Sequence, residues 1–316
     1  MKRKLLTGLI GLALSSTAIA QQDAAFSQYF FNMMYVNPAY AGTRDYLSGT
    51  LIHRTQWVGV DGAPSSQTLN VHSALKGGKV GLGLQLINDQ AGPVKTTGFG
   101  VTYAYHLPIN DETQLSFGLS GSIASLRISG DQIHIEDQSD LAFSTGSSSA
   151  IVPDASAGIY LHKQRWYVGF SASHLLQTKF SINDAAGQRS AKYYRNYFLA
   201  AGHVFKINDE VDFRPSFLAK YVQSAPLIGE LDACFIFKQR FFAGAGLRTS
   251  KRINTDGADN ALVAIAEVEF LRMFRFGYSY DYYIGKQAIY NGGTHELMLG
   301  WDFSKAKTKM ENPRFF

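Results

Sequence analysis

Residues 274–283 read FRFGYSYDYY, and this stretch decides the fold. Large aromatic side chains stand at every second position from Phe274 to Tyr282. The residues between them are small or charged: Arg275, Gly277, Ser279 and Asp281. Because successive side chains of a strand point to opposite faces, the stretch predicts a strand with one apolar and one polar face.

The same alternation recurs from about residue 47 onward, for example over 99–107, 211–221 and 297–303. About fourteen strands are expected, over 47–57, 65–75, 79–88, 95–107, 113–128, 154–162, 165–174, 193–206, 210–221, 227–237, 240–249, 259–269, 272–283 and 294–304. Most reach the roughly 9–11 residues that a tilted strand needs to cross a membrane. Hydrocarbon cannot satisfy backbone polar groups, so such a sheet must close on itself. We therefore predict an all-β fold, a transmembrane antiparallel β-barrel of about 14 strands, over 47–304.

The connections between these strands differ in length at the two ends of the barrel. Even-to-odd connections are tight: 76–78, 108–112, 163–164, 207–209, 238–239 and 271. Odd-to-even connections are mostly longer: 58–64, 89–94, 129–153, 175–192, 222–226, 250–258 and 284–293. Outer-membrane barrels have short periplasmic turns and longer extracellular loops. The sequence thus predicts an outer-membrane protein with extracellular long loops and periplasmic N- and C-termini.

Composition narrows the class of protein further. The chain has 316 residues, of which 46% are hydrophobic and 17% charged, with a single cysteine. The apolar content argues against a disordered chain, and one cysteine cannot form an internal disulfide. Its cysteine, Cys234, falls on the inward parity, and we expect it to be a small buried residue.

The first twenty residues have the pattern of a secretion signal. Lys2, Arg3 and Lys4 precede a short apolar run, and Ala18-Ile19-Ala20 has the form of a cleavage site. We expect residues 1–20 to be removed, which leaves 27 basic against 25 acidic residues and a net charge of +2 instead of +5. Because no basic stripe remains, no nucleic-acid partner is expected.

The polar faces of the strands carry both signs of charge, and we expect these residues in the lumen: Arg54, Arg127, Arg214, Lys220, Arg275, Glu230, Asp232, Glu267, Glu269, Asp281, Glu296 and Asp302. A network of paired charges is the favoured interpretation, and an ion-selective ring is the alternative. Several strands also place glycine or serine on this face, for example Gly81, Gly98 and Gly118. Such a face leaves room for either solvent or an inserted segment.

The segment 21–46 is the candidate insert. It reads QQDAAFSQYFFNMMYVNPAYAGTRDY, is dense in aromatic residues and methionine, and lacks strand alternation. Asn37 precedes a proline, which favours an extended or turn conformation there. We expect this segment to fold into or against the periplasmic mouth as a plug.

No catalytic or cofactor site is apparent in the sequence. The eight histidines lack metal-ligand spacing, and no nucleophile elbow occurs. The stretch His134-Ile135-Glu136-Asp137 offers carboxylates for a divalent cation, but a solvated loop is the favoured interpretation. We therefore expect a non-enzymatic protein with no cofactor and no metal.

One stretch of the insert carries a more specific signal. Residues 26–42, FSQYFFNMMYVNPAYAG, resemble the N-terminal signature of the PorP/SprF family, outer-membrane proteins of the type IX secretion system in Bacteroidota. The matching positions are Phe26, Ser27, Gln28, Tyr29, Asn32, Asn37, Pro38, Ala39, Tyr40, Ala41 and Gly42. Arg54, Gln56 and Trp57 continue the similarity, as do residues 62–64 and 67–68.

The resemblance implies a FadL-like barrel without a catalytic site and a role in the export or surface anchoring of a partner. That partner would be a secreted protein with a C-terminal sorting domain, such as a large adhesin of gliding motility. Loops 129–153 and 175–192 are the expected contact regions, because they are long. The basic tail 305–316 is a candidate periplasmic docking peptide for other secretion components, with a frayed terminus as the alternative. A FadL-like or porin-like transporter of small or hydrophobic solutes remains the alternative function.

Overall fold

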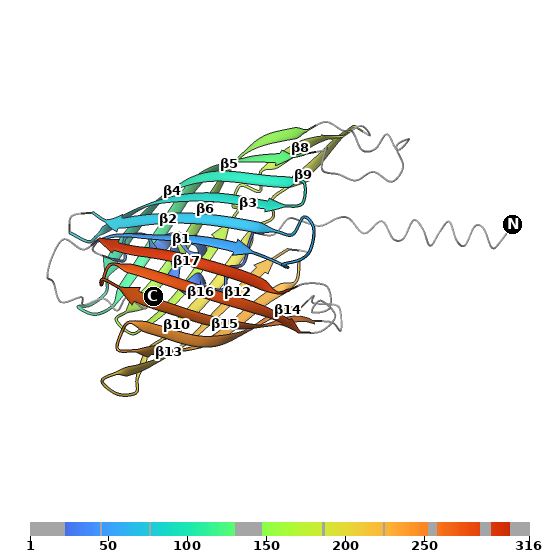
Figure 1. The fold of residues 1–316 in the computed structure, drawn as a ribbon. Coiled ribbons are helices and arrows are strands. Elements are labelled where there is room, and N and C mark those ends of the chain that lie inside the picture. Colours follow the sequence, from blue (N-terminus) through green and yellow to red (C-terminus); the bar gives the residue numbers. More distant parts are fainter. Residues whose placement is uncertain are drawn as a thin grey trace, which may run out of the picture.

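A computed structural model describes residues 23–44, 46–75, 77–129, 147–184, 187–223, 225–251, 258–284 and 292–303. The chain forms a closed antiparallel barrel of fourteen strands (Figure 1). The first seven are β1 (Leu47–Thr55), β2 (Ser65–Ala74), β3 (Val80–Ala91), β4 (Val94–Pro108), β5 (Gln114–Ile128), β6 (Ser148–Lys163) and β7 (Trp166–Ser173). The others are β10 (Asn196–His203) with its continuation β11 (Phe205–Lys206), β12 (Val211–Val222), β13 (Leu227–Phe237), β14 (Phe241–Lys251), β15 (Ala258–Phe270), β16 (Phe274–Ile284) and β17 (Thr294–Phe303).

Each strand pairs with its neighbours in the chain, and β1 pairs with β17 to close the ring. The predicted fold class is confirmed, and most predicted strands agree with the structure to within about three residues. The largest difference is β6, which begins at Ser148 instead of 154 because residues 148–153 pair in register with 123–128 of β5. The predicted loop 89–94 is a tight turn, since β3 and β4 extend to Ala91 and Val94.

The two ends of the barrel are distinct. We call the end with the connections β2–β3, β4–β5 and β6–β7 the tight-turn end, and the opposite end the long-loop end. At the long-loop end, the predicted loop 175–192 contains a hairpin of its own, β8 (Lys179–Asp184) and β9 (Gly187–Lys192) (Figure 1). No helix among the described residues is long and apolar enough to cross a membrane.

The outward face of the strands is a band of exposed apolar side chains. Leu84, Val101 and Phe170 are 51%, 50% and 50% exposed, which is far more than a water-soluble core would leave open. The alternate residues of the same strands point inward. This division fits a barrel whose outer face meets lipid.

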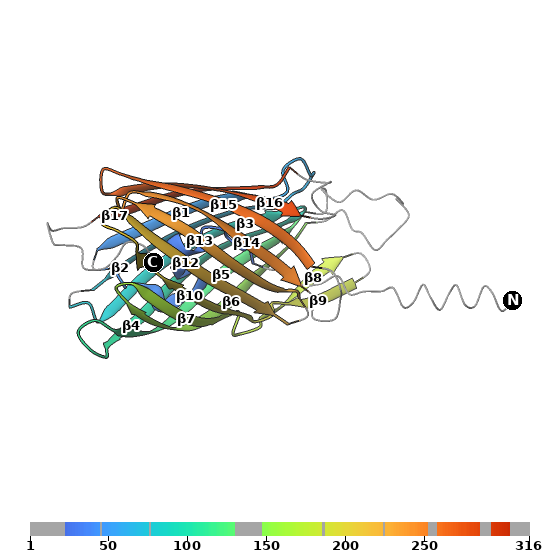
Figure 2. The same ribbon diagram turned by 90° about the horizontal axis from the view of Figure 1, so that it is seen from below.

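Inside the ring lies the segment 23–44, visible as the short blue coils within the strands in Figure 2. It contains three short helical turns, η1 (Tyr29–Phe31), α2 (Met33–Val36) and η2 (Pro38–Tyr40). Its apolar side chains form the core of the molecule: Phe26, Tyr29, Phe30, Phe31, Met33, Met34 and Tyr40 are all at most 5% exposed. We call residues 23–44 the plug.

Candidate functional site: the plugged lumen

The plug runs through the lumen from one end of the barrel to the other. Its first described residue, Asp23, contacts His174, which follows β7 at the long-loop end. Near its other terminus, Arg44 contacts Asp302 at the end of β17, beside the start of β1 at the tight-turn end. The plug therefore occupies the lumen itself. Asp23 and the long loops lie at the same end of the barrel. The prediction of a periplasmic N-terminus and the prediction of extracellular long loops therefore cannot both hold at residue 23.

A cluster of charged side chains holds the beginning of the plug, and we call it the ionic cluster: Arg54, Glu230, Arg248, Asp281 and Glu296. Arg54 contacts Asp281 at 2.6 Å and Glu296 at 2.9 Å. Arg248 contacts Glu230 at 2.7 Å and Asp281 at 2.7 Å. These residues come from β1, β13, β14, β16 and β17, so the cluster ties together strands on one side of the barrel.

Ser27 of the plug sits at the centre of the ionic cluster. Its hydroxyl donates to Asp281 at 2.6 Å and accepts from Arg54 at 2.9 Å and from Arg248 at 2.8 Å. The backbone N–H groups of Ser27 and Gln28 donate to the two carboxylate oxygens of Glu296 at 3.0 and 2.8 Å. Buried charges are tolerated when they are paired and hydrogen-bonded, and this set meets both conditions.

The middle of the plug contacts the wall with aromatic and amide groups. The Tyr29 hydroxyl donates to Asp232 at 3.1 Å, and the guanidinium of Arg214 lies 3.8 Å from the Phe30 ring centroid. On the opposite wall, Asn70 donates to the side chain of Asn32 at 2.8 Å. The plug is therefore fixed to β12, β13 and β2 at mid-height.

Asn37 anchors the later part of the plug. Its side-chain amide donates to the carbonyl of Ile159 at 2.9 Å and to that of Phe170 at 3.3 Å, while its oxygen accepts from Ala39 at 3.0 Å. The same side chain thus caps the beginning of η2 and joins the plug to β6 and β7. This contact explains why an Asn-Pro step suits this place.

Glycines of the wall provide space for the plug. A Cβ on Gly81 would overlap the carbonyl of Ala41, and one on Gly118 would overlap the backbone of Ala39. By contrast, a Cβ on Gly98 or Gly100 would meet only wall atoms, at 3.4 Å or more. The sequence left open whether the lumen holds solvent or an inserted segment. In the structure, the plug lies against Gly81 and Gly118, whereas open space remains beside Gly98 and Gly100.

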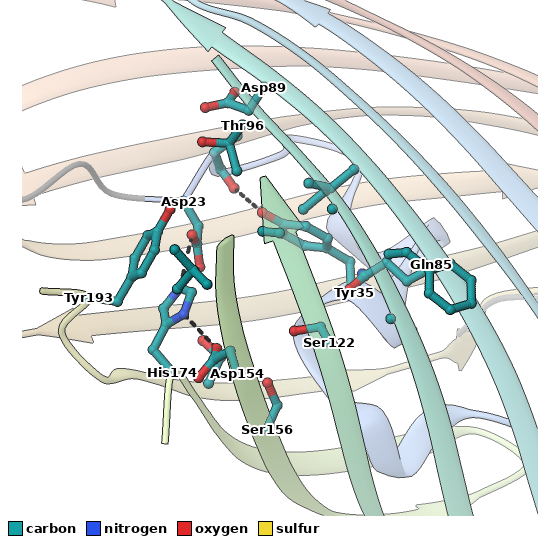
Figure 3. A pocket seen from close by; sticks show the side chains of 18 of the residues that line it. Asp23, Tyr35, Gln85, Asp89, Thr96, Ser122, Asp154, Ser156, His174 and Tyr193 are labelled. Carbon is teal, nitrogen blue, oxygen red and sulfur yellow. Dashed lines mark hydrogen bonds and ion pairs between the residues drawn. The ribbon is translucent and has the colours of Figure 1, made fainter. Parts of the chain in front are cut away.

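The open space is a cavity of about 150 Å³ on the long-loop side of the plug. Figure 3 shows Asp23 and Tyr35 of the plug beside Gln85, Asp89, Ser122 and Ser156 of the wall. The remaining lining includes the apolar side chains of Phe26, Ile87, Val152 and Phe198. Such a mixture of apolar surface and a few polar groups is typical of ligand cavities.

A second polar cluster, which we call the mouth clasp, fixes the plug beside this cavity: Asp23, Asp154, His174, Asn196 and Lys220. His174 contacts Asp154 at 2.7 Å and Asp23 at 2.9 Å (Figure 3). Asn196 donates to the Asp23 carboxylate at 2.6 Å, and the Lys220 ammonium donates to the Asp23 carbonyl at 2.7 Å. Asp23 is therefore held directly by three segments, namely the residue after β7, β10 and β12, and indirectly by β6 through Asp154 and His174.

The mouth clasp is strongly ionic. Burial disfavours the imidazolium of His174, but the carboxylates of Asp23 and Asp154 outweigh this and raise the pKa of His174 to about 10. Burial likewise opposes ionisation of Asp23, yet the charges of His174 and Lys220 hold its pKa well below the usual range. At neutral pH the contact between His174 and Asp23 is therefore an ion pair.

Ten of the twelve charged residues expected in the lumen are buried there: Arg54, Arg214, Lys220, Arg275, Glu230, Asp232, Glu267, Asp281, Glu296 and Asp302. Glu269 is half-buried at the tight-turn end, opposite Arg275. The prediction for Arg127 is wrong, because this side chain is exposed on the outer face while its neighbour Leu126 is buried. Arg127 lies four residues after the outward-facing Ile123. Because side chains alternate between the two faces, this spacing places Arg127 on the outer face.

Sequence reasoning missed Arg44, Arg248 and the members of the mouth clasp other than Lys220. Arg248 lies on the same strand face as Gly244 and Gly246, which the sequence predicts to face the lumen. The alternation could therefore have predicted that Arg248 also faces inward. Asp23 and His174 lie outside the strands, where no alternation applies. Cys234 is buried as expected, facing Gly244 across β13 and β14. The His134–Asp137 stretch and the tail 305–316 lie outside the described residues.

Comparison with known proteins identifies both a family and similar folds. The family described as "Type IX secretion system membrane protein PorP/SprF" matches residues 18–301. The CymD monoaromatic hydrocarbon channel is 11% identical over 90% of this chain and 95% of its own, with a TM-score of 0.56. The Ralstonia pickettii toluene transporter TbuX is 9% identical over 85% and 92%, with a TM-score of 0.51. At these identities the structures share the fold alone, and no curated protein sequence matches the chain.

Proposed function

We propose, from the premise that this chain belongs to the PorP/SprF family of type IX secretion system membrane proteins, that it supports the export or surface anchoring of a partner protein. The chain is an outer-membrane barrel. Its partner would be a secreted protein with a C-terminal sorting domain, such as a large adhesin of the kind used in gliding motility. The barrel acts without catalysis.

The observation that carries this proposal is the attachment of the plug to the wall all around the lumen. Contacts reach β1 through Arg54, β2 through Asn70, β6 and β7 through Asn37, β13 through Asp232, and β17 through Glu296. A segment fixed in this way turns a pore into a rigid scaffold. A scaffold is what a docking or anchoring component needs, since its partner requires a preformed surface.

The partner would bind at the long-loop end. This end carries the β8–β9 hairpin, the cavity of about 150 Å³ and the mouth clasp, whereas the described connections at the opposite end are tight turns. We take the long-loop end as extracellular, with loops 129–153 and 175–192 as contact regions. Asp23 then lies on the outer side of the lumen, and the end of β17, after which the tail 305–316 comes in the sequence, lies on the periplasmic side.

The alternative function is a transporter for small or hydrophobic solutes. The cavity favours it, because its apolar lining and few polar groups suit a small ligand. Transport would require the plug to move. That movement would break the contacts of Ser27 with the ionic cluster as well as those of Asp23 with the mouth clasp.

A gene deletion with quantitative proteomics of the cell surface and the medium tests the proposal. Loss of one or a few proteins with C-terminal sorting domains, restored by a copy in trans, is the expected result. A tagged barrel should also recover one of these proteins after chemical cross-linking in cells. An unchanged surface and medium, together with impaired uptake of a hydrophobic solute, would reject the proposal in favour of transport.

A truncation after Ser304 tests the tail separately. We expect the barrel to assemble and keep its heat-modifiable gel mobility, while the cross-linked periplasmic partners are lost. If the partners persist, the tail has no docking role.

A further inference from the structure

Two positive side chains stand side by side on the outer face of the barrel. Lys95 of β4 and Arg127 of β5 are direct cross-strand partners, and both are exposed. They belong to the outward series of their strands, since Phe99 and Ile123 on the same faces are also exposed. Like charges placed directly opposite each other in a sheet destabilise it, so this pair calls for a counter-charge.

The neighbouring part of the wall provides none. The outward-facing residues of β3, β4, β5 and β6 include no aspartate or glutamate. In the row of the pair, Gln90 lies beside Lys95 and Ser149 beside Arg127. Within the described part of the chain, neither cation has an ion-pair partner.

Three lysines at the tight-turn end show a contrasting arrangement. Each is paired with an acidic residue: Lys163 with Glu112 at 2.7 Å, Lys206 with Asp209 at 2.6 Å and Lys238 with Glu210 at 3.5 Å. The chain thus neutralises these rim cations internally. Lys95 and Arg127 differ in that no acidic residue in the described part of the wall supplies their counter-charge.

The height of the pair on the barrel indicates where that charge comes from. The exposed apolar band on β4 runs from Leu107 to Phe99, and on β5 from Phe117 to Ile123. Lys95 and Arg127 each lie four residues beyond the band. This is about 13 Å along a strand, or about 10 Å along the membrane normal for a strand tilted by about 40°. Their long side chains therefore reach the level of lipid headgroups.

We propose that Lys95 and Arg127 together bind the phosphate of a membrane-lipid headgroup. Arginine offers a planar fork that matches phosphate oxygens, and lysine adds a point charge from the next strand. Exposed hydroxyls of Ser125 and Ser149 flank the pair and can donate to the remaining oxygens. The site fixes the long-loop side of the barrel to lipid and is independent of the partner protein proposed above.

Native mass spectrometry of the full-length barrel released from nanodiscs tests this site. The nanodiscs contain phosphatidylcholine with either phosphatidylglycerol or diphosphoryl lipid A, and retained lipid is counted for each variant. The test variant is Lys95→Gln/Arg127→Gln. The matched control, Lys206→Gln/Lys238→Gln, removes two exposed cations that already have protein partners. Heat-modifiable gel mobility confirms that every variant is folded.

We expect the test variant to retain the anionic lipids, phosphatidylglycerol and lipid A, at least 10-fold more weakly, and roughly 30-fold if each cation contributes fully. The control variant should match the wild type, and inorganic phosphate in tenfold excess should displace little lipid. Equal retention by the test variant overturns the proposal. Displacement of the lipid by inorganic phosphate also overturns it, because the pair would then be a general anion site.

Discussion

Ser27 donates its hydroxyl hydrogen to Asp281 across 2.6 Å, although 254 residues separate the two in the chain. Ser27 lies near the start of the plug, and Asp281 lies on β16, close to the end of the barrel sequence. The same carboxylate also accepts from Arg54 and Arg248. This contact joins the two ends of the chain and makes the plug part of the barrel's folding unit.

Ser27→Ala should therefore weaken the whole barrel and not the plug alone. The change removes a donor to Asp281 and an acceptor for two guanidinium groups, while leaving the ion pairs in place. We expect a loss of about 1–2 kcal/mol in the free energy of unfolding. Urea unfolding in detergent, followed by intrinsic fluorescence, measures it. Ser125→Ala, on the exposed outer face of β5, serves as the control and should change stability by less than about 0.5 kcal/mol.

Glu296→Gln should cost more, because it removes a charge from a closed ionic cluster. Arg54 would lose one of its two carboxylate partners, and the amides of Ser27 and Gln28 would lose a charged acceptor. Breaking a buried ion pair by removing one partner costs about 3–5 kcal/mol. Glu112→Gln removes a charge of the same sign from an exposed pair and should cost much less, because solvent screens exposed ion pairs. Equal unfolding free energies for the two variants would show that the cluster is not a stabilising unit.

Gly118→Ala should displace the plug. The added methyl group would overlap the backbone of Ala39, and forcing extra atoms into a packed site costs about 1–3 kcal/mol. We expect higher single-channel conductance in a planar bilayer than for the wild type. Gly121→Ala is the matched control on the same strand, because a Cβ there meets no atom within 4 Å. If Gly118→Ala conducts no more than Gly121→Ala, the plug does not rest on this glycine.

The mouth clasp predicts a particular dependence on pH. Since the pKa of His174 is raised from 6.5 to about 10, its stabilisation is complete below about pH 6.5 and is lost as the pH rises through 10. Asp23 has a lowered pKa, so its contribution to stability is present at every pH above the usual pKa of aspartate. The clasp is therefore strongest in mildly acidic solution.

Comparing His174→Gln with the wild type tests this dependence. Near pH 6 the variant should be less stable by about 2 kcal/mol, because it loses charged hydrogen bonds to Asp23 and Asp154. The difference in stability between the variant and the wild type, measured by thermal melting, should narrow steadily between pH 7 and 10. His53→Gln, on the exposed outer face, controls for general effects of removing a histidine. A gap that stays constant over this range would mean that His174 is not charged in the clasp.

Much of this architecture could be predicted because alternation is a local property. A period of two over ten residues identifies a strand and its inward face without reference to any other part of the chain. That is why the ten buried lumen charges were found. Composition alone was sufficient to predict an insert, since Phe30, Phe31 and Met33 need burial and have no strand pattern of their own.

The error at Arg127 has the same origin. Its charge suggested the lumen, whereas its position in the alternation placed it outside with Ile123. In a strand, a shift of one residue exchanges the two faces. The position of a residue in the alternation therefore decides which face it occupies, even where its charge suggests the other face. The structure places Arg127 beside Lys95 because β4 and β5 pair in one register only.

The sequence by itself determined the barrel, the approximate strand boundaries, the lengths of most connections and the presence of an insert, because each depends on residues close together in the chain. Only the tertiary structure decided that Asp23 lies at the long-loop end, that Ser27 meets Asp281, and that open space remains beside Gly98. These facts depend on how the ring closes between β1 and β17 and between β10 and β12. Closure brings together side chains that no local pattern connects, and it sets the width of the lumen that the plug must fill.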